Sequence, residues 1–273
     1  MKKILTITCL TTMILSATTT FSSCSSDNND TPNVQPSTAI NPKNVFTGGL
    51  PKTAAEMSIQ TNEKGQVVSL KSEEGIVTFK YNEATTRGTA PAYDVIMTVG
   101  DGKEKLVCNL YLNKDGFVSR CEEEEYNLEG MERELWDFTY NSDGQLLTML
   151  RIEGGKETTT IKYQDGDIVE TKTVSASEPE ESSLYKVYYT SNTISTPIIN
   201  KGCIMLFDET LGIDMDEMRY AYYAGLLGKA TKHLPVRLVS EKYQDTSLFE
   251  WTLNAAGYPT LFSAGVEKYP FTW

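Results

Sequence analysis

Tyr111-Leu112-Asn113-Lys114-Asp115-Gly116-Phe117-Val118 has the form of a tight turn between two strands, with apolar residues on both sides of Asn-Lys-Asp-Gly. Asn and Asp side chains stabilise such turns, and Gly takes the left-handed step that other residues avoid. Tyr140-Asn141-Ser142-Asp143-Gly144-Gln145-Leu146 has the same form. The chain is therefore expected to contain β-hairpins built on one kind of turn.

Turns of a similar kind recur along the body of the chain. Turns that place Gly where a positive φ is needed are expected at Asn62–Gly65, Ser72–Gly75, Gly100–Gly102, Asn113–Gly116, Asn141–Gly144, Gln164–Gly166 and Asn254–Gly257. Strands are expected at Ile76–Tyr81, Tyr93–Val99, Leu106–Leu112, Phe117–Tyr126, Leu135–Tyr140, Leu146–Ile152, Thr158–Tyr163, Ile168–Val174, Val236–Tyr243, Ser247–Leu253, Tyr258–Phe262 and Tyr269–Trp273. This arrangement predicts a mainly β protein with an antiparallel meander sheet.

One segment in the C-terminal half has a helical period instead. From Asp214 to about Lys229, Met215, Met218, Tyr222 and Leu226 recur at helical spacing. Asp214 can cap the first turn. We expect one amphipathic helix there, covering the open face or one end of the sheet, with its Met and Tyr side chains in the core.

Three features together resemble a known group of proteins. These are the hairpin meander, the tract from Arg219 to Pro235 (RYAYYAGLLGKATKHLP), and Trp251–Thr260 (WTLNAAGYPT). They resemble Bacteroides-type putative lipoproteins described as a domain of unknown function with a porin-like fold (DUF4595-like). The resemblance covers about residues 45–273. It implies a large curved antiparallel sheet or an incomplete barrel, and it carries no activity and no functional residues.

Cys24 is the residue from which the cellular location is predicted. It follows Met1-Lys2-Lys3, an uncharged and mostly apolar run, and Phe21-Ser22-Ser23. This is the layout of a bacterial lipoprotein signal, which is removed and contributes nothing to the fold. Residues 1–23 are predicted to be that signal peptide, and Cys24 the palmitate-bearing anchor of the mature chain in the membrane. An ordinary secretory signal cut near Ser22 is the alternative.

Residues 24–44 are expected to form a disordered tether, because their Ser, Asn, Asp, Thr and Pro offer almost nothing to bury. The acidic start at Asp27 and Asp30 resembles the export signals of surface lipoproteins in Bacteroides-like bacteria, although a merely soluble linker has the same composition. Residues 45–273 can form a single β-rich domain. The predicted location is the outer membrane, on the cell surface or the periplasmic face.

Charge argues against nucleic acid as a partner. The chain carries 25 basic and 37 acidic residues, and loss of Lys2 and Lys3 with the signal leaves 23 against 37. Nucleic-acid binding depends on neutralising phosphates, which an acidic body cannot do. The membrane contact is therefore expected to be the lipid anchor and not a basic face.

The cysteines after the anchor are Cys108, Cys121 and Cys203, and their spacing contains no paired zinc motif. Cys108 and Cys121 flank the turn at Asn113–Gly116 and oppose each other if the hairpin pairs in the register of that turn. A disulfide between them and two unpaired buried thiols are the two alternatives. No metal and no cofactor is predicted.

Catalytic signatures are not apparent, and no catalytic residue is predicted. His233 is the only histidine, so the chain offers one imidazole base at most. Glu122-Glu123-Glu124-Glu125 alternate between the two faces of a strand, and both faces are expected to be solvated there. Nothing selects a pair of these carboxylates for glycan hydrolysis.

Aromatic residues suggest binding. Fifteen tyrosines and three tryptophans are present, and exposed rings at Trp136, Trp251 and Trp273 could stack on a ligand. Core filling accounts for the same composition. The predicted function is a non-enzymatic, lipid-anchored envelope module that binds a glycan, a peptide or an envelope partner. A structural component of an envelope complex, or a carboxylate-based glycan hydrolase, are the alternatives.

Overall fold

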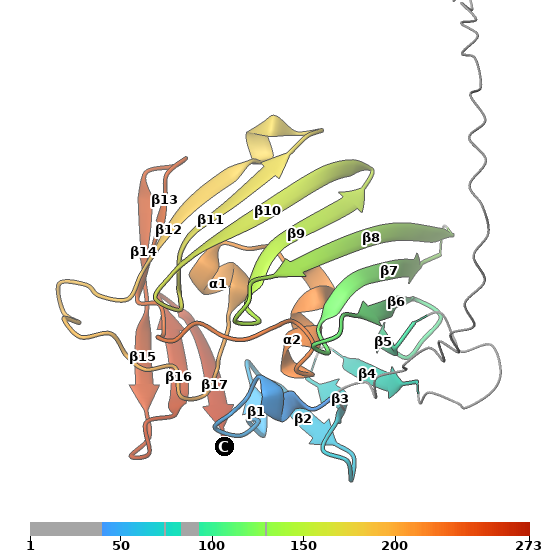
Figure 1. Ribbon diagram of the computed structural model, residues 1–273, viewed down its shortest axis with the longest axis horizontal. Coiled ribbons are helices and arrows are strands. Elements are labelled where there is room, and N and C mark those ends of the chain that lie inside the picture. The colour runs from blue at the N-terminus through green and yellow to red at the C-terminus, as the bar shows by residue number, and fades with distance from the viewer. Residues whose placement is uncertain (1–39, 74, 83–92, 129) are drawn as a thin grey trace, which may run out of the picture. The chain divides into compact units, whose positions relative to one another are not determined.

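The turns expected from the sequence separate the strands of one antiparallel sheet, which curves around two short helices in Figure 1. The computed structural model describes residues 40–73, 75–82, 93–128 and 130–273. Chain contacts group residues 36–273 into one unit, apart from residues 1–35. The predicted signal peptide, Cys24 and the tether up to residue 39 lie outside the described residues.

The strands are short and follow one another with few interruptions. Their bounds are β1 (Thr53–Ala54), β2 (Met57–Thr61), β3 (Val67–Lys71), β4 (Ile76–Tyr81), β5 (Val95–Val99), β6 (Lys105–Leu112), β7 (Val118–Tyr126), β8 (Met131–Tyr140), β9 (Leu146–Glu153), β10 (Gly155–Gln164), β11 (Asp167–Ser175), β12 (Ser183–Tyr188), β13 (Arg237–Ser240), β14 (Asp245–Leu248), β15 (Glu250–Leu253), β16 (Pro259–Ala264) and β17 (Glu267–Thr272).

Pairing of chain neighbours builds the meander, and β1 joins its two ends. Each strand from β2 to β13 pairs antiparallel with the next, and β15, β16 and β17 form a second run. Strand β1 pairs with both β2 and β17. Between β14 and β15 lies Phe249 alone, so the chain passes directly from pairing with β13 to pairing with β16. The sheet is thus a nearly closed barrel, as the resemblance implied.

The hairpin turns have the geometry that their sequence predicts. Asn113 Oδ1 accepts hydrogen bonds from the backbone N–H groups of Asp115 (2.9 Å) and Phe117 (3.0 Å), and Gly116 has φ +83°. Asn141 makes the matching bonds to Asp143 and Gln145, with Gly144 at φ +81°. A side-chain oxygen that holds two backbone donors fixes where each hairpin reverses.

Three tyrosine hydroxyls tie one strand to the start of the strand before it. Tyr81 donates its hydroxyl to Val67 O (2.8 Å), Tyr140 to Val118 O (2.7 Å) and Tyr163 to Leu146 O (2.8 Å). In each case an aromatic residue near the end of one strand bonds the first residue of the preceding strand. These three of the fifteen tyrosines therefore have a structural role that the composition alone did not reveal.

A segment between β12 and β13 fills the concave side of the sheet. Within residues 203–234, here named the plug, α1 (Phe207–Leu211), the 3-10 turn η3 (Asp216–Met218) and α2 (Arg219–Tyr223) lie inside the curve of the strands (Figure 1). Met215, Met218, Tyr222 and Leu226 are all buried, as their spacing predicted. The plug and the inner faces of the strands share one hydrophobic core.

The predicted single helix over 214–229 is wrong in its extent. Helical structure ends at Tyr223 because Gly225 and Gly228 take φ values of +77° and +83°. A Cβ on Gly228 would lie 2.8 Å from Gly144 O, so the chain passes too close to a hairpin turn for any side chain. The segment packs inside the sheet instead of covering an end as a regular helix.

The plug also binds the turns at one end of the sheet. Lys229 N–H donates to Gly144 O (2.9 Å) and Lys232 N–H to Gly166 O (3.1 Å), while Val118 N–H donates to Leu226 O (2.8 Å). These backbone bonds join the plug to the hairpin turns at Asn113–Gly116, Asn141–Gly144 and Gln164–Gly166. None of the helices in the described part of the chain is long and apolar enough to span a bilayer.

Candidate functional site

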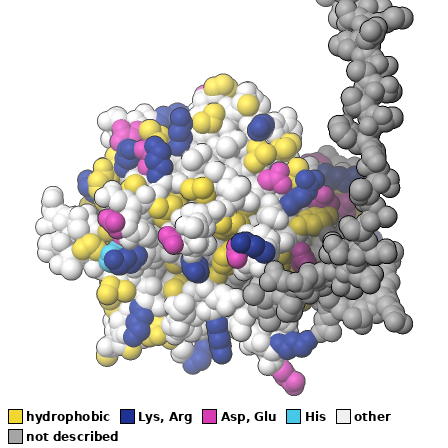
Figure 2. Space-filling view, in the orientation of Figure 1, with side chains coloured by type: hydrophobic (Ala, Val, Ile, Leu, Met, Phe, Trp, Pro, Cys, Tyr) yellow, Lys and Arg dark blue, Asp and Glu magenta, His cyan; other side chains and the backbone are white. Residues whose placement is uncertain are grey.

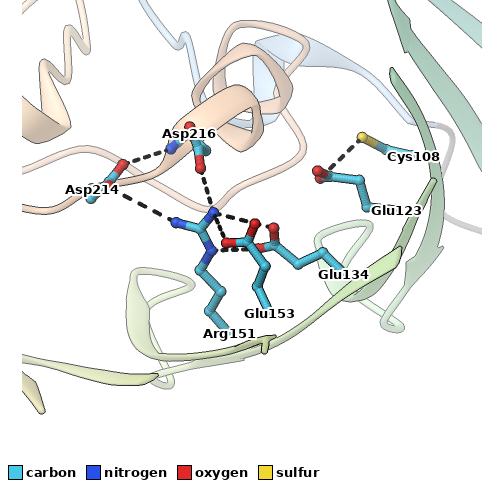
Figure 3. A network of polar contacts seen from close by, with 7 residues as sticks. All are labelled: Cys108, Glu123, Glu134, Arg151, Glu153, Asp214 and Asp216. Atoms are coloured by element: carbon cyan, nitrogen blue, oxygen red, sulfur yellow. Dashed lines mark hydrogen bonds and ion pairs between the residues drawn. The ribbon is translucent and has the colours of Figure 1, made fainter. Parts of the chain in front are cut away.

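A charged wall lies inside the sheet, where β7, β8 and β9 face η3. Alternation along each strand turns Glu123, Glu134 and Arg151 inward. Arg151 is the centre of the network: its Nε lies 2.5 Å from Glu134 Oε1, and its Nη2 lies 2.7 Å from Glu153 Oε2 and 2.6 Å from Asp216 Oδ2 (Figure 3). The guanidinium therefore joins two strands of the sheet to the plug.

Burial and unequal charge set the electrostatics of this wall. Burial raises the pKa of the Glu134 carboxyl to about 7, against the lowering effect of Arg151. Burial lowers the pKa of Arg151, but bonding to Glu134 and the charges of Asp216 and Glu153 more than offset it, so its pKa is raised. One guanidinium serves several carboxylates, and the wall is acidic overall.

Trp136 lies beneath the guanidinium, whose carbon is 5.0 Å from the ring centroid. The side chain is 1% exposed and stacks on Phe138. This predicted stacking residue has no open face for a ligand, because the wall covers it. Its contact with Arg151 is a cation–π interaction that adds to the ion pairs.

The run of four glutamates divides between the two faces of β7. Glu122 and Glu124 face outward and contact Arg120 and Arg133. The expectation of solvent on both faces is wrong for Glu123, which is 7% exposed. Burial and the charges of Glu134 and Glu217 raise its pKa to about 8. Inward alternation brings this carboxylate into the core of the sheet.

Cys108 and Cys121 are free thiols, both fully buried. The hairpin register pairs Cys108 with Glu123 and Cys121 with Leu110, so the expectation that the two cysteines oppose each other is wrong. The Cys108 thiol donates to Glu123 Oε2 (3.6 Å). The two sulfur atoms and a carboxylate oxygen of Glu123 all lie within 4.8 Å of one another. This is the group among the described residues that could hold a metal ion.

A pocket of about 350 Å³ adjoins the charged wall. Its floor is apolar, with Met57, Leu70 and Leu106 from three strands of the sheet. Glu217 and Tyr220 of the plug close the other side. Glu125, near the end of β7, also lines the pocket. Lys105 is also at the pocket, with its Nζ 5.6 Å from the centroid of Tyr126.

The pocket carries more negative than positive charge. Its lining contains three carboxylates, Glu104, Glu125 and Glu217, against the single ammonium of Lys105. Burial and the neighbouring Asp216 raise the pKa of Glu217. The arrangement therefore suits a ligand that combines an apolar body with positive charge.

The remaining predicted residues lie elsewhere. Trp251 and Trp273 are partly exposed, and their indole N–H groups donate to Pro235 O and Pro259 O (both 2.7 Å). Their use as stacking surfaces stays a prediction. His233 Nδ1 lies 2.6 Å from Asp167 Oδ2, which holds the ring at the start of β11. The histidine, cyan in Figure 2, reaches the surface shown there.

Comparison with known proteins agrees with this architecture. The family described as a domain of unknown function (DUF4595) with porin-like fold matches residues 59–261. The chain belongs to this family. The DUF4595 chain is similar to a solved porin-like protein from Bacteroides uniformis, with 16% identity, a TM-score of 0.59 and coverage of 79% of this chain and 88% of that one.

A second porin-like protein, from Bacteroides vulgatus, has 11% identity and a TM-score of 0.54, over 82% of this chain and 99% of that one. At these identities the likeness shows the fold alone. No curated protein matches the chain. The resemblance stated from the sequence is thus confirmed for family and fold, and what the DUF4595 chain does rests on its own residues.

Proposed function

We propose that the protein is a non-enzymatic, lipid-anchored envelope module that binds a basic, amphiphilic peptide segment in the pocket between the sheet and the plug. The observation that carries this is the pocket lining: an apolar floor and three carboxylates against one ammonium. A pocket of about 350 Å³ lies within the size range of ligand sites, roughly 300–1,000 Å³. An apolar floor with few charged groups gives affinity and orientation together.

A peptide is favoured over a glycan because of where the indoles lie. Sugar faces stack on open rings, whereas Trp136 is buried. Trp251 packs on Phe262 (ring centroids 5.0 Å apart) and Trp273 on Tyr258 (4.7 Å), which leaves less of either ring open. Positive charge in the ligand follows from the excess of carboxylates in the lining. An envelope protein that presents such a segment would make this chain part of a complex.

Binding is tested with two labelled ten-residue peptides, one alternating Leu with Lys and the other Leu with Glu. Fluorescence anisotropy with the purified full chain should show binding of the Lys peptide only, weakening as salt is added. Glu125→Gln and Glu217→Gln should each weaken it by about 2- to 5-fold, the effect of losing one charge contact at an exposed or partly exposed position.

Glu267→Gln is the matched control, since Glu267 is exposed on β17 and does not line the pocket. It should bind the Lys peptide as the wild type does. Equal affinity for the two peptides, or equal loss in all three variants, would contradict the proposal.

The anchor at Cys24 is tested separately in cells. A palmitate analogue should label the wild type, and Cys24→Ala should remove the label and release the protein from sedimented membranes, because stable anchoring requires the acyl chains. Cys203→Ala is the control and should stay labelled and sedimented. An unlabelled wild type would reject the lipid anchor and leave the peptide-binding proposal standing.

A further inference from the structure

Two adjacent strands bring two thiols and a carboxylate together inside the sheet. Cys121 and Glu123 are two residues apart on β7 and share its inner face, while Cys108 lies opposite Glu123 on β6. Their ligand atoms all lie within 4.8 Å of one another. The backbone of a paired hairpin holds all three, so the cluster does not depend on a loop.

We propose that Cys108, Cys121 and Glu123 form a binding site for a zinc ion. Thiolate sulfur and carboxylate oxygen are both zinc ligands, and tetrahedral coordination with Zn–S of about 2.3 Å and Zn–O of about 2.0 Å separates a sulfur from an oxygen by roughly 3.5 Å. The distance between Cys108 Sγ and Glu123 Oε2 is 3.6 Å. Little movement is needed to bring these two donors to an ion.

The buried carboxyl is the member of the cluster that ordinary core packing does not explain. Cys108 and Cys121 are 0% exposed and Glu123 is 7% exposed. Among the described residues, no Lys, Arg or His forms an ion pair with Glu123, and the Cys108 thiol is the hydrogen-bond partner found for its carboxylate. Without a cation this carboxyl must either stay protonated or bear the cost of an unpaired buried charge, and an apolar side chain would pack there more favourably. A bound cation would explain why a glutamate occupies this buried position.

Among the described residues, the cluster offers three protein ligands. Glu134 is paired with Glu123 in the register of β7 and β8, but Arg151 holds its carboxylate (Figure 3). Three protein ligands and one open position are the arrangement of zinc sites that also bind water or a further ligand. Binding displaces the thiol protons of Cys108 and Cys121 to solvent, together with the proton of the Glu123 carboxyl where it is protonated, and leaves two thiolates and a carboxylate on the ion.

Cobalt provides a direct readout of this site. We expect Co²⁺ added to the reduced, metal-free full chain to give thiolate-to-cobalt charge-transfer absorption and the visible bands of tetrahedral cobalt, saturating at one equivalent. One equivalent of Zn²⁺ should remove the bands and raise the melting temperature. Cys108→Ser and Cys121→Ser should abolish the bands, and Glu123→Gln should weaken zinc binding by more than about 10-fold, since even outer partners of zinc ligands cost 10- to 100-fold.

Cys203→Ser is the matched control because Cys203 is the remaining cysteine of the described residues and lies in the plug. Its cobalt spectrum should equal that of the wild type, and circular dichroism checks that every variant is folded. A wild type without cobalt bands, or bands that persist in Cys108→Ser, overturns the proposal. A Cys108–Cys121 disulfide that forms in air despite one equivalent of Zn²⁺ also overturns it.

Discussion

Replacing Tyr222 with Ala is expected to lower the free energy of unfolding by about 3–5 kcal/mol, the range for removing a large aromatic ring from a core. Tyr222 is 1% exposed in the plug. Its ring makes edge contacts with Phe207 (5.4 Å) and Phe46 (5.5 Å), and its hydroxyl donates to Cys203 O (2.6 Å). Urea denaturation followed by circular dichroism measures the change.

Two further variants serve as controls. One separates the contribution of the Tyr222 ring from that of its hydroxyl, and the other removes an exposed tyrosine. Tyr222→Phe keeps the ring and loses one hydrogen bond, which should cost about 1–2 kcal/mol because the Cys203 carbonyl loses its partner. Tyr243→Ala removes a side chain that is 67% exposed and should stay within about 0.5 kcal/mol of the wild type. A Tyr222→Ala variant as stable as Tyr243→Ala would show that the plug is not part of the folding core.

The hairpins were predictable because their signal is local. Asn141, Asp143 and Gly144 determine a turn within four residues, and the strands on either side follow from it. The extent of the helix predicted over residues 214–229 was not predictable in this way, since its end depends on a close contact between Gly228 and the turn at Gly144. Helix α1 has no clear period in its five residues, and its place inside the sheet depends on tertiary packing.

The candidate site was harder to predict because its residues meet only through register. The register at the turn pairs Leu112 with Val118 and would place Cys108 opposite Glu122. An irregularity between Tyr111 and Leu112 shifts the pairing by one residue, so Cys108 faces Glu123. No short sequence window contains Arg151 together with Glu134 and Asp216, and the sequence therefore did not single it out. The run of glutamates was visible, but only the fold separates the buried Glu123 from its solvated neighbours.

Arg151→Met is expected to lower the free energy of unfolding at pH 8 by about 3–5 kcal/mol, the cost of removing one partner from a buried ion pair. The Arg151 side chain is 18% exposed and that of Glu134 is 8% exposed, so the unpaired Glu134 carboxylate cannot be well hydrated. Arg133→Met is the matched control. Arg133 is 70% exposed where it pairs with Glu124, and its loss should cost no more than about 1 kcal/mol.

The cost of Arg151→Met should be smaller at pH 5 than at pH 8. In the wild type the pKa of Glu134 is raised from 4.5 to about 7, so its contribution to stability is full below pH 4.5 and is lost as the pH rises through 7. Without the guanidinium, the pKa rises further and the carboxyl stays protonated at pH 5, where a neutral acid is cheaper to bury. Urea unfolding at both pH values measures this, and an equal cost at the two would show that Arg151 stabilises the sheet by packing on Trp136 and not by charge.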